Sequence, residues 1–305
     1  MIEDQTQIVV MKGSSTRKRV LAAVSPALDR SVPIVVCIPA FRRQRHLRLT
    51  LDSLASQRTG RRFAVVIVDN DARDRESVAV AAEFLITGKF AGLCVVEPRQ
   101  GNCHAINAAF ETALATFSDA AHFLMIDDDE VASADWLELM ISTAETSGQV
   151  PMIYGCGNCL VTRRVFELLG SPAFDLRFNF LGGGDVDFFT RCRRAGMTFQ
   201  WVAEATISET VPDSRTHPRW LALRALRIGA INYHVQRKAA RTPWSRLKLL
   251  AKILALVPLS LFRAVRLVAT EHKALIALHP MIVAAGGTLA LVGIEPQPYR
   301  ASKIT

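Results

Sequence analysis

The sequence has few of the features that mark nucleic-acid-binding, disulfide-bonded or secreted proteins. Aromatic residues make up 7% of its 305 residues, and RNP-like motifs and zinc-finger spacings are absent, which argues against nucleic-acid binding. Its six cysteines are scattered, and CGNC at 156–159 has no second pair, which argues against a disulfide framework or a zinc site. The early apolar stretch at 20–28 is short and contains Pro26, so no secretory signal is expected and the default location is cytoplasmic.

Acidic residues are scarce in the last third of the chain. Residues 213–305 hold 15 Lys and Arg against 3 Asp and Glu, a local charge of +12 in a chain whose net charge is +9. This region is also rich in Leu, Ala, Val and Ile, a composition typical of helices that lie on an anionic membrane surface. We therefore predict a basic, apolar helical region and a peripheral protein at the cytoplasmic face of the cell membrane. The alternative is one transmembrane helix at 274–294, which has 21 uncharged residues.

Before that region, short apolar runs alternate with helical patterns. Apolar runs that end in polar residues occupy 33–40, 63–70, 92–97 and 122–129, and helical patterns lie between them at 46–57, 78–86 and 104–117. This order predicts an α/β fold with a mostly parallel sheet flanked by helices. The predicted domain covers 32–212, in two halves at 32–130 and 131–212, after a flexible leader at 1–31.

The last of these runs, FLMIDDDE at 123–130, ends in four consecutive acids. Alternation in an extended segment turns Asp127 and Asp129 to one face and Asp128 to the other. Two carboxylates on one face suit Mg²⁺ or Mn²⁺ whose remaining ligands are water and substrate phosphate oxygens. The alternative is that the acids cap a following helix that begins near Ser133. Polar residues also end the other strands, so they are expected to converge at one edge of the sheet.

Several motifs then occur in a recognisable order. They are CIPAFRR, VDND, EPRQGNCHAINAAFETA, IDDDE, GCGNCLVTRR and GGGDVDFFTRCRRAG. Over residues 33–229 the chain resembles the family 2 inverting glycosyltransferases, which have a Rossmann-like GT-A fold. The stretch at 207–229 is similar to exopolysaccharide glucosyltransferases of succinoglycan-type assembly. The resemblance implies a hexosyltransferase for surface polysaccharide that uses a nucleotide-sugar donor, a UDP-hexose, and a glycan or lipid-linked oligosaccharide acceptor.

The resemblance also implies site residues. Asp185 is the expected general base, which takes the proton of the acceptor hydroxyl. Asp127 and Asp129 are expected to bind the metal, with Glu209 nearby. The remaining residues are expected to bind the donor: Pro39, Ala40, Phe41, Arg42, Asp69, Asn107, Asp127, Asp128, Arg224 and Arg227. For Arg224 and Arg227 a solvated helix face is an equal alternative, and for Asp185 the alternative is a helix N-cap.

Two positions depart from the family pattern. Gly184 stands where the family has a Glu before the catalytic Asp, and Ile106 stands where an Arg is common. Two other functions compete with glycosyl transfer. A sugar-phosphate nucleotidyltransferase lacks support because VCIPAFRR has no G-x-G-T-R opening. A non-catalytic membrane scaffold with the same fold is the second alternative.

Overall fold

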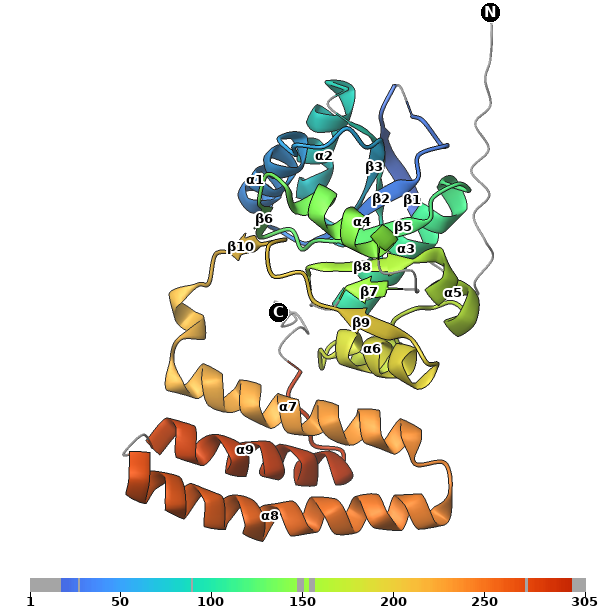
Figure 1. Cartoon of the computed structure of the whole chain (residues 1–305). Helices are drawn as coiled ribbons and strands as arrows, with labels where there is room; N and C mark the ends of the chain where they lie inside the picture. The colour runs from blue at the N-terminus through green and yellow to red at the C-terminus, as the bar shows by residue number, and fades with distance from the viewer. Residues whose placement is uncertain are drawn as a thin grey trace, which may run out of the picture.

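The computed structural model describes residues 18–26, 28–88, 90–146, 151–153, 157–271 and 274–297. An α/β domain occupies one part of the molecule, and three long helices lie beneath it in Figure 1. An extended segment after residue 209 joins the two parts.

The α/β domain is built on an eight-stranded sheet in the order β1-β4-β3-β2-β5-β8-β7-β9. The central strands β2, β3, β4 and β5 are mutually parallel, and β8 runs antiparallel to β5. A separate two-stranded ribbon pairs β6 with β10. The strands are β1 (Val20–Val24), β2 (Ile34–Ala40), β3 (Phe63–Asp69), β4 (Ala91–Val96), β5 (His122–Met125), β6 (Glu130–Ala132), β7 (Pro151–Ile153), β8 (Cys159–Thr162), β9 (Thr198–Gln200) and β10 (Ile207–Glu209).

Helices cover both faces of the sheet because the buried strands are apolar on both faces. One core packs α1, α2 and α4 around residues such as Leu51, Phe84 and Trp136. The other packs α3, α5 and α6 around Phe110 and Phe188. The elements are α1 (Gln44–Ala55), α2 (Glu76–Ile86), α3 (Asn102–Thr116), α4 (Trp136–Thr146), α5 (Arg163–Leu169), the 3-10 helix η1 (Leu176–Phe178), α6 (Gly184–Arg194) and the 3-10 helix η2 (Asp213–Arg215).

The predicted α/β class with its mostly parallel sheet is confirmed. Two local predictions are wrong. Val20–Val24, expected in a flexible leader, forms β1, which pairs antiparallel with β4; residues 1–17 lie outside the described part. The acids do not cap a helix, because β6 follows them and α4 begins only at Trp136.

The C-terminal region forms α7 (Pro218–Ala239), α8 (Pro243–Glu271) and α9 (Ala274–Leu291), with α9 lying between α7 and α8 (Figure 1). Helices α7 and α9 pack very closely, since a Cβ on Gly229 would overlap the Val283 carbonyl and a Cβ on Gly286 would overlap the Leu226 carbonyl. In the described residues no helix combines the length and apolarity that a membrane crossing requires.

Candidate functional site

The carboxyl ends of the parallel strands meet at one edge of the sheet, as predicted. Ala40 on β2 pairs with Asp69 on β3, and Asp69 pairs in turn with Val96 on β4. Backbone hydrogen bonds extend these ladders, from Asn70 N–H to the Ala40 carbonyl at 2.9 Å and from Glu97 N–H to the Asp69 carbonyl at 2.9 Å. The residues that follow β2, β3 and β4 therefore lie side by side.

The Asp69 carboxylate has no exposed surface. Its oxygens accept hydrogen bonds from the backbone N–H groups of Asp71 (2.8 Å), Ser77 (3.1 Å) and Val78 (3.2 Å). Burial raises its pKa, while these hydrogen bonds oppose the rise. In this structure Asp69 therefore fixes the loop between β3 and the start of α2, instead of facing the open edge where a donor base could bind.

The loop after β2 contains the exposed part of the predicted base pocket. Pro39 and Ala40 are buried within the strand, whereas Phe41 is half-buried and Arg42 is exposed. The Arg42 guanidinium lies 5.0 Å from the centre of the Phe41 ring and donates to the Asp71 carboxylate at 2.5 Å. Only Phe41 and Arg42 of this turn can contact a ligand directly.

The acidic run after β5 alternates in exposure, but it forms a turn instead of the expected extended segment, since the Glu130 N–H donates to the Asp127 carbonyl at 3.2 Å. Asp127 and Asp129 are half-buried and Asp128 and Glu130 are buried. Asp128 accepts hydrogen bonds from the Phe41 N–H at 2.9 Å and from Arg43 at 3.0 Å. Asp128, expected to bind the donor, is thus occupied in fixing the loop after β2.

The electrostatics of this run favour a cation. Burial raises the pKa of Asp127, and the charges of Asp128 and Asp129 raise it further. Burial likewise raises the pKa of Glu130, with Asp127 adding to the rise. Arg43 offsets part of this charge, and it contacts Asp129 at 2.5 Å. The carboxylates outnumber the cations that neutralise them.

Glu209 joins the same cluster from another element. The β6–β10 ribbon places Glu209 opposite Glu130, and the charge of Glu209 contributes to the raised pKa of Asp127. Arg215 donates to the Glu209 carboxylate at 2.8 Å. Within the described residues no set of three side chains forms a closed metal site. The donor set instead fits an open Mg²⁺ or Mn²⁺ site with one or two carboxylates, completed by diphosphate oxygens.

Asp185 lies in the first turn of α6, half-buried, and its carboxylate has no hydrogen bond or ion pair with any described residue. Burial raises the pKa of the Cys159 thiol at the start of β8, and the charges of Asp127, Glu130 and Asp185 raise it further. All three carboxylates therefore act electrostatically on this one buried residue.

The two departures from the family pattern have structural causes. A Cβ on Gly184 would lie 2.8 Å from Cδ1 of Phe174 and 2.9 Å from Sγ of Cys103, so this chain has no space for a side chain there. Ile106 is buried in the core formed by α3. Neither position presents a polar side chain to the site.

Asn107 is not available to bind the donor. Its amide donates to the Phe174 carbonyl at 2.8 Å and accepts from the Phe174 N–H at 2.7 Å. It is buried and holds the segment before η1 against α3. The prediction that Asn107 contacts the donor is therefore not met in this structure.

Arg224 and Arg227 lie on α7, outside the α/β domain. Arg224 is exposed, and its guanidinium lies 5.3 Å from the Trp220 ring centre on the same helix. Arg227 is half-buried. In this structure Arg224 therefore lies on a solvated face of its helix, which is the alternative given for it above.

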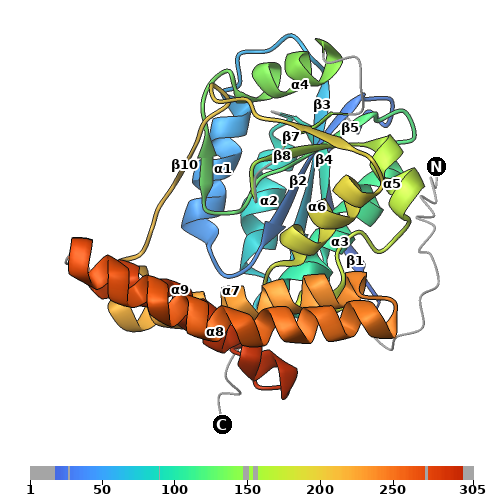
Figure 2. The same cartoon turned by 60° about the horizontal axis from the view of Figure 1, so that its bottom comes forward.

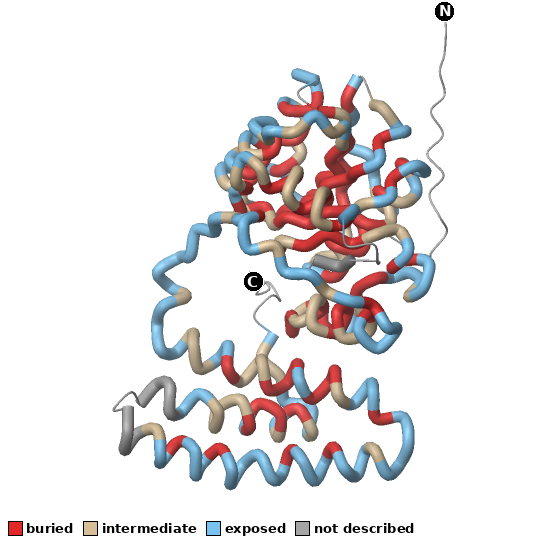
Figure 3. The backbone as a smooth tube through the Cα atoms, in the orientation of Figure 1, coloured by how far each residue is buried: buried red, intermediate tan, exposed pale blue. Residues whose placement is uncertain are grey.

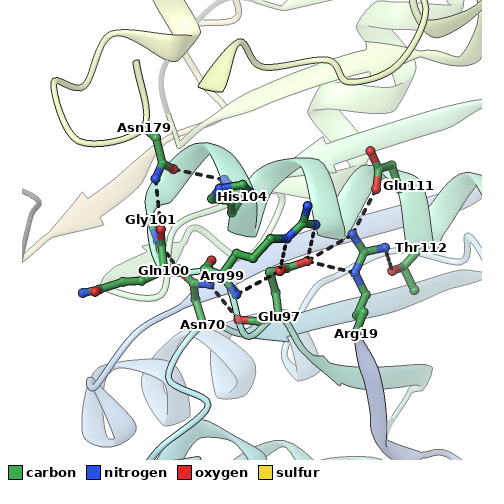
Figure 4. A network of polar contacts seen from close by, with 10 residues as sticks. All are labelled: Arg19, Asn70, Glu97, Arg99, Gln100, Gly101, His104, Glu111, Thr112 and Asn179. Carbon is green, nitrogen blue, oxygen red and sulfur yellow. Dashed lines mark hydrogen bonds and ion pairs between the residues drawn. The ribbon is translucent and has the colours of Figure 1, made fainter. Parts of the chain in front are cut away.

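A polar network that the sequence did not reveal holds the loop between β4 and α3 (Figure 4). The buried Glu97 carboxylate accepts hydrogen bonds from the Arg99 guanidinium at 2.8 and 3.0 Å and from Arg19 at 3.3 Å. Arg19 also reaches Glu111 at 2.9 Å. Arg19 precedes β1, within the predicted leader at 1–31, and no pattern in the local sequence connects it to Glu97.

The same loop is fixed from two other sides. The Asn70 amide donates to the Glu97 and Arg99 carbonyls at 2.9 and 2.8 Å and accepts from the Gly101 N–H at 2.7 Å. The Asn179 amide donates to the Gln100 carbonyl at 2.9 Å (Figure 4). Gly101 has φ of 128°, and any Cβ there would overlap Asn179, so the position requires glycine.

Comparison with known proteins agrees with this geometry. The family model described as Glycosyl transferase family 2 matches residues 35–195. Succinoglycan biosynthesis protein ExoM of Rhizobium meliloti (strain 1021) is 30% identical over 240 residues, which cover 65% of this chain and 72% of that protein. The structure also resembles that of the mannosyltransferase PcManGT from Pyrobaculum calidifontis in complex with GDP-Man and Mn²⁺, with a TM-score of 0.60, 18% identity and coverage of 88% and 89% of the two chains. The expected GT-A fold is thereby confirmed, and the chain belongs to glycosyl transferase family 2.

Proposed function

We propose that the protein transfers a hexose from a nucleoside diphosphate sugar, a UDP-hexose, to a glycan or lipid-linked acceptor, with inversion at the anomeric carbon. The observation that carries this proposal is the cluster of carboxylates at the carboxyl edge of the sheet. The half-buried Asp127 and Asp129 follow β5, and the β6–β10 ribbon places Glu209 opposite Glu130. These acids suit a metal-bound diphosphate, and the half-buried Asp185 in the first turn of α6 suits a hydroxyl group that must lose a proton.

Asp185 acts as the general base. Its carboxylate accepts the proton of the acceptor hydroxyl while that oxygen forms a bond to the anomeric carbon. The bond from the anomeric carbon to the diphosphate oxygen breaks on the opposite face, and the nucleoside diphosphate leaves with the bonding electrons. The absence of a hydrogen bond or ion pair to Asp185 among the described residues leaves its oxygens free to accept that proton.

The acidic run holds the donor end. Asp127 and Asp129 would hold Mn²⁺ or Mg²⁺, with Glu209 contributing from β10; when bound, the ion neutralises charge on the leaving diphosphate. Phe41 and Arg42 wall the base side of the donor, and Asp128 and Asp69 fix the loops that carry these contacts.

The similarity to a known protein supports the proposed acceptor, and the surface of α8 supports the proposed location. The similarity to a succinoglycan biosynthesis protein supports a role in exopolysaccharide assembly. The outermost helix, α8, exposes Leu254, Leu261, Phe262 and Val265 by 51 to 70% (Figure 3). The same helix carries Lys and Arg at 246, 248, 252, 263 and 266. This mixture supports peripheral binding to an anionic membrane, with the catalytic domain in the cytoplasm.

A nucleotide-sugar panel tests the proposal. The purified full chain, supplied with Mn²⁺ or Mg²⁺ and one donor at a time, is assayed for release of UDP, GDP or dTDP. We expect release of UDP, and we expect it to stop when the metal is chelated. Release of GDP or dTDP instead would mean that the donor carries a different nucleotide. If no donor gave metal-dependent release, the proposed transferase activity would be contradicted.

A further inference from the structure

A second polar site lies away from the acidic run, at the inner end of the helical layer. A cavity of about 690 Å³ opens between α7, η1, the start of α8 and the segment after α9. Five cationic side chains line it: Arg177, Arg237, Lys238, Arg241 and Arg246. None of them belongs to the metal or base positions described above.

The positive charge in this cavity is only partly neutralised. Lys238 contacts Asp175 and Asp187, each at 2.7 Å, and Arg177 contacts Glu295 at 3.4 Å. Among the described residues no carboxylate pairs with the other three arginines. Arg237 donates to the Tyr233 hydroxyl at 3.3 Å and Arg246 donates to the Ala240 carbonyl at 3.4 Å. Guanidinium groups that line one cavity and have no carboxylate partner are suited to bind phosphate oxygens.

An apolar groove continues from this cavity. A neighbouring hollow of about 320 Å³ shares Tyr233, Arg237, Arg246 and Leu291 with it and adds three leucines, Leu247, Leu249 and Leu250. The two hollows together place a cationic end beside an apolar end. A free anion would use only the first, whereas an amphiphile with a phosphate group would use both.

The cavity is also connected to the candidate catalytic helix. Lys238 on its wall forms an ion pair with Asp187, which lies in the first turn of α6 two residues after Asp185. Figure 2 shows the three C-terminal helices from their outer side, with α8 in front. Residues two apart on a helix point in nearly opposite directions, so this ion pair connects the cavity to the first turn of α6 through Asp187 and not to the Asp185 carboxylate itself.

We propose that this cavity binds the phosphate or diphosphate group of an amphiphilic acceptor, whose apolar chain lies along the leucines of α8. The identity of the ligand as the acceptor rests on the proposed function, whereas the binding itself does not. Arg237, Arg241 and Arg246 hold the phosphate oxygens, and Lys238 links their position to α6.

The test measures binding of three probes to the full chain by calorimetry. Farnesyl diphosphate has both an apolar chain and a diphosphate, inorganic diphosphate has only the anion, and farnesol has only the chain. The test variant carries Arg241→Ala and Arg246→Ala. The control variant carries Lys248→Ala and Arg263→Ala, which remove the same charge from exposed positions of α8 that do not line the cavity.

We expect the parent to bind farnesyl diphosphate more tightly than either fragment. The test variant should bind it about tenfold more weakly, since two exposed charge contacts are lost, and the control variant should bind like the parent. Equal losses in both variants would mean nonspecific charge attraction and would overturn the site. If the parent bound inorganic diphosphate as tightly as farnesyl diphosphate, the proposal that the ligand has an apolar chain would be overturned.

UDP binding and thermal melting separate this inference from the proposed function. Both variants should bind UDP with Mn²⁺ as the parent does and melt at the same temperature, because the substituted residues are exposed and belong to the C-terminal helical region, not to the acidic run after β5. If the nucleotide-sugar panel fails but farnesyl diphosphate binding behaves as expected, the cavity stands and the transferase assignment falls. If the panel succeeds and the test variant matches the control, the cavity assignment falls alone.

Discussion

Asp185 is the residue on which the proposed chemistry depends most. The substitution Asp185→Asn keeps the size of the side chain and its place in the first turn of α6, but removes its ability to accept a proton. We expect donor affinity to stay unchanged and transfer to fall by about two to four orders of magnitude. Calorimetry with UDP and a transfer assay on the same preparation give the two readouts. A parallel loss of binding and turnover would mean that Asp185 holds the donor or the fold, and not the proton.

Gly184 provides a structural test beside it. Gly184→Ala places a Cβ 2.8 Å from the Phe174 ring and 2.9 Å from the Cys103 sulfur, so we expect a loss of about 1–3 kcal/mol in the free energy of unfolding from overpacking. Denaturant melts measure this. Gly60→Ala is the matched control, because nothing lies within 4 Å of a Cβ there. Equal stability of the two variants would show that the space around Gly184 adjusts freely.

At this scale the sequence predicted the exposed residues of the site better than its buried ones. Asp127 and Asp129 are more exposed than Asp128, as alternation predicts, but the run is a turn, and Arg43 contacts both Asp128 and Asp129. The buried polar residues are different, because their partners are distant: Asn107 bonds to Phe174, 67 residues away, and Asp128 bonds to Phe41, 87 residues away. No local pattern reveals such pairs, so both residues were expected to touch the donor.

Among the elements, the buried strands were predictable and the edge strand was not. The strands β2 to β5 are short apolar runs because both of their faces are covered, and this composition is visible in the sequence. Strand β1 lies at the edge of the sheet, and most of its side chains are exposed, so it has no alternating pattern. Its place in the fold depends on pairing with β4 and on Arg19, which reaches Glu97 across the sheet edge.

The loop between β4 and α3 depends on the charge of Glu97. Burial alone would raise the pKa of Glu97, but the side-chain and backbone hydrogen bonds from Arg99 lower it overall. A carboxyl with a lowered pKa in the folded state stabilises the fold above its ordinary pKa, and this contribution is lost as the pH falls through the lowered value. Glu97→Gln should therefore reduce stability by about 2 kcal/mol near neutral pH, and the difference from the parent should shrink below about pH 4.

Denaturant melts over this pH range measure the difference. Glu111→Gln is the control, because Glu111 contacts the same Arg19 at 2.9 Å from a half-buried position, whereas the Glu97 carboxylate is buried, and we expect it to change the stability little. A constant difference between parent and Glu97→Gln at every pH would mean that the Glu97 charge does not stabilise the loop.

The molecule as a whole has a catalytic domain on one side and an exposed apolar helix on the other. If α8 lies on anionic lipid, Phe262→Glu, which alters a side chain that is 70% exposed, should weaken flotation with anionic vesicles by about tenfold or more. Ile86→Glu on α2 alters a side chain that is 68% exposed and serves as the control. High salt should weaken binding of the parent. No flotation of the parent, or equal effects of both substitutions, would contradict the membrane assignment.

The most direct test of the central claim, that the acidic run after β5 holds a metal-bound donor, is calorimetry of UDP binding with and without Mn²⁺. The parent and Asp119→Ala, which removes an exposed acid outside the site, should bind UDP more tightly when Mn²⁺ is present. Asp129→Ala should bind UDP equally with and without the metal, because a carboxylate that would bind the ion directly has been removed. A variant that keeps the full Mn²⁺-dependent gain in affinity would contradict the claim.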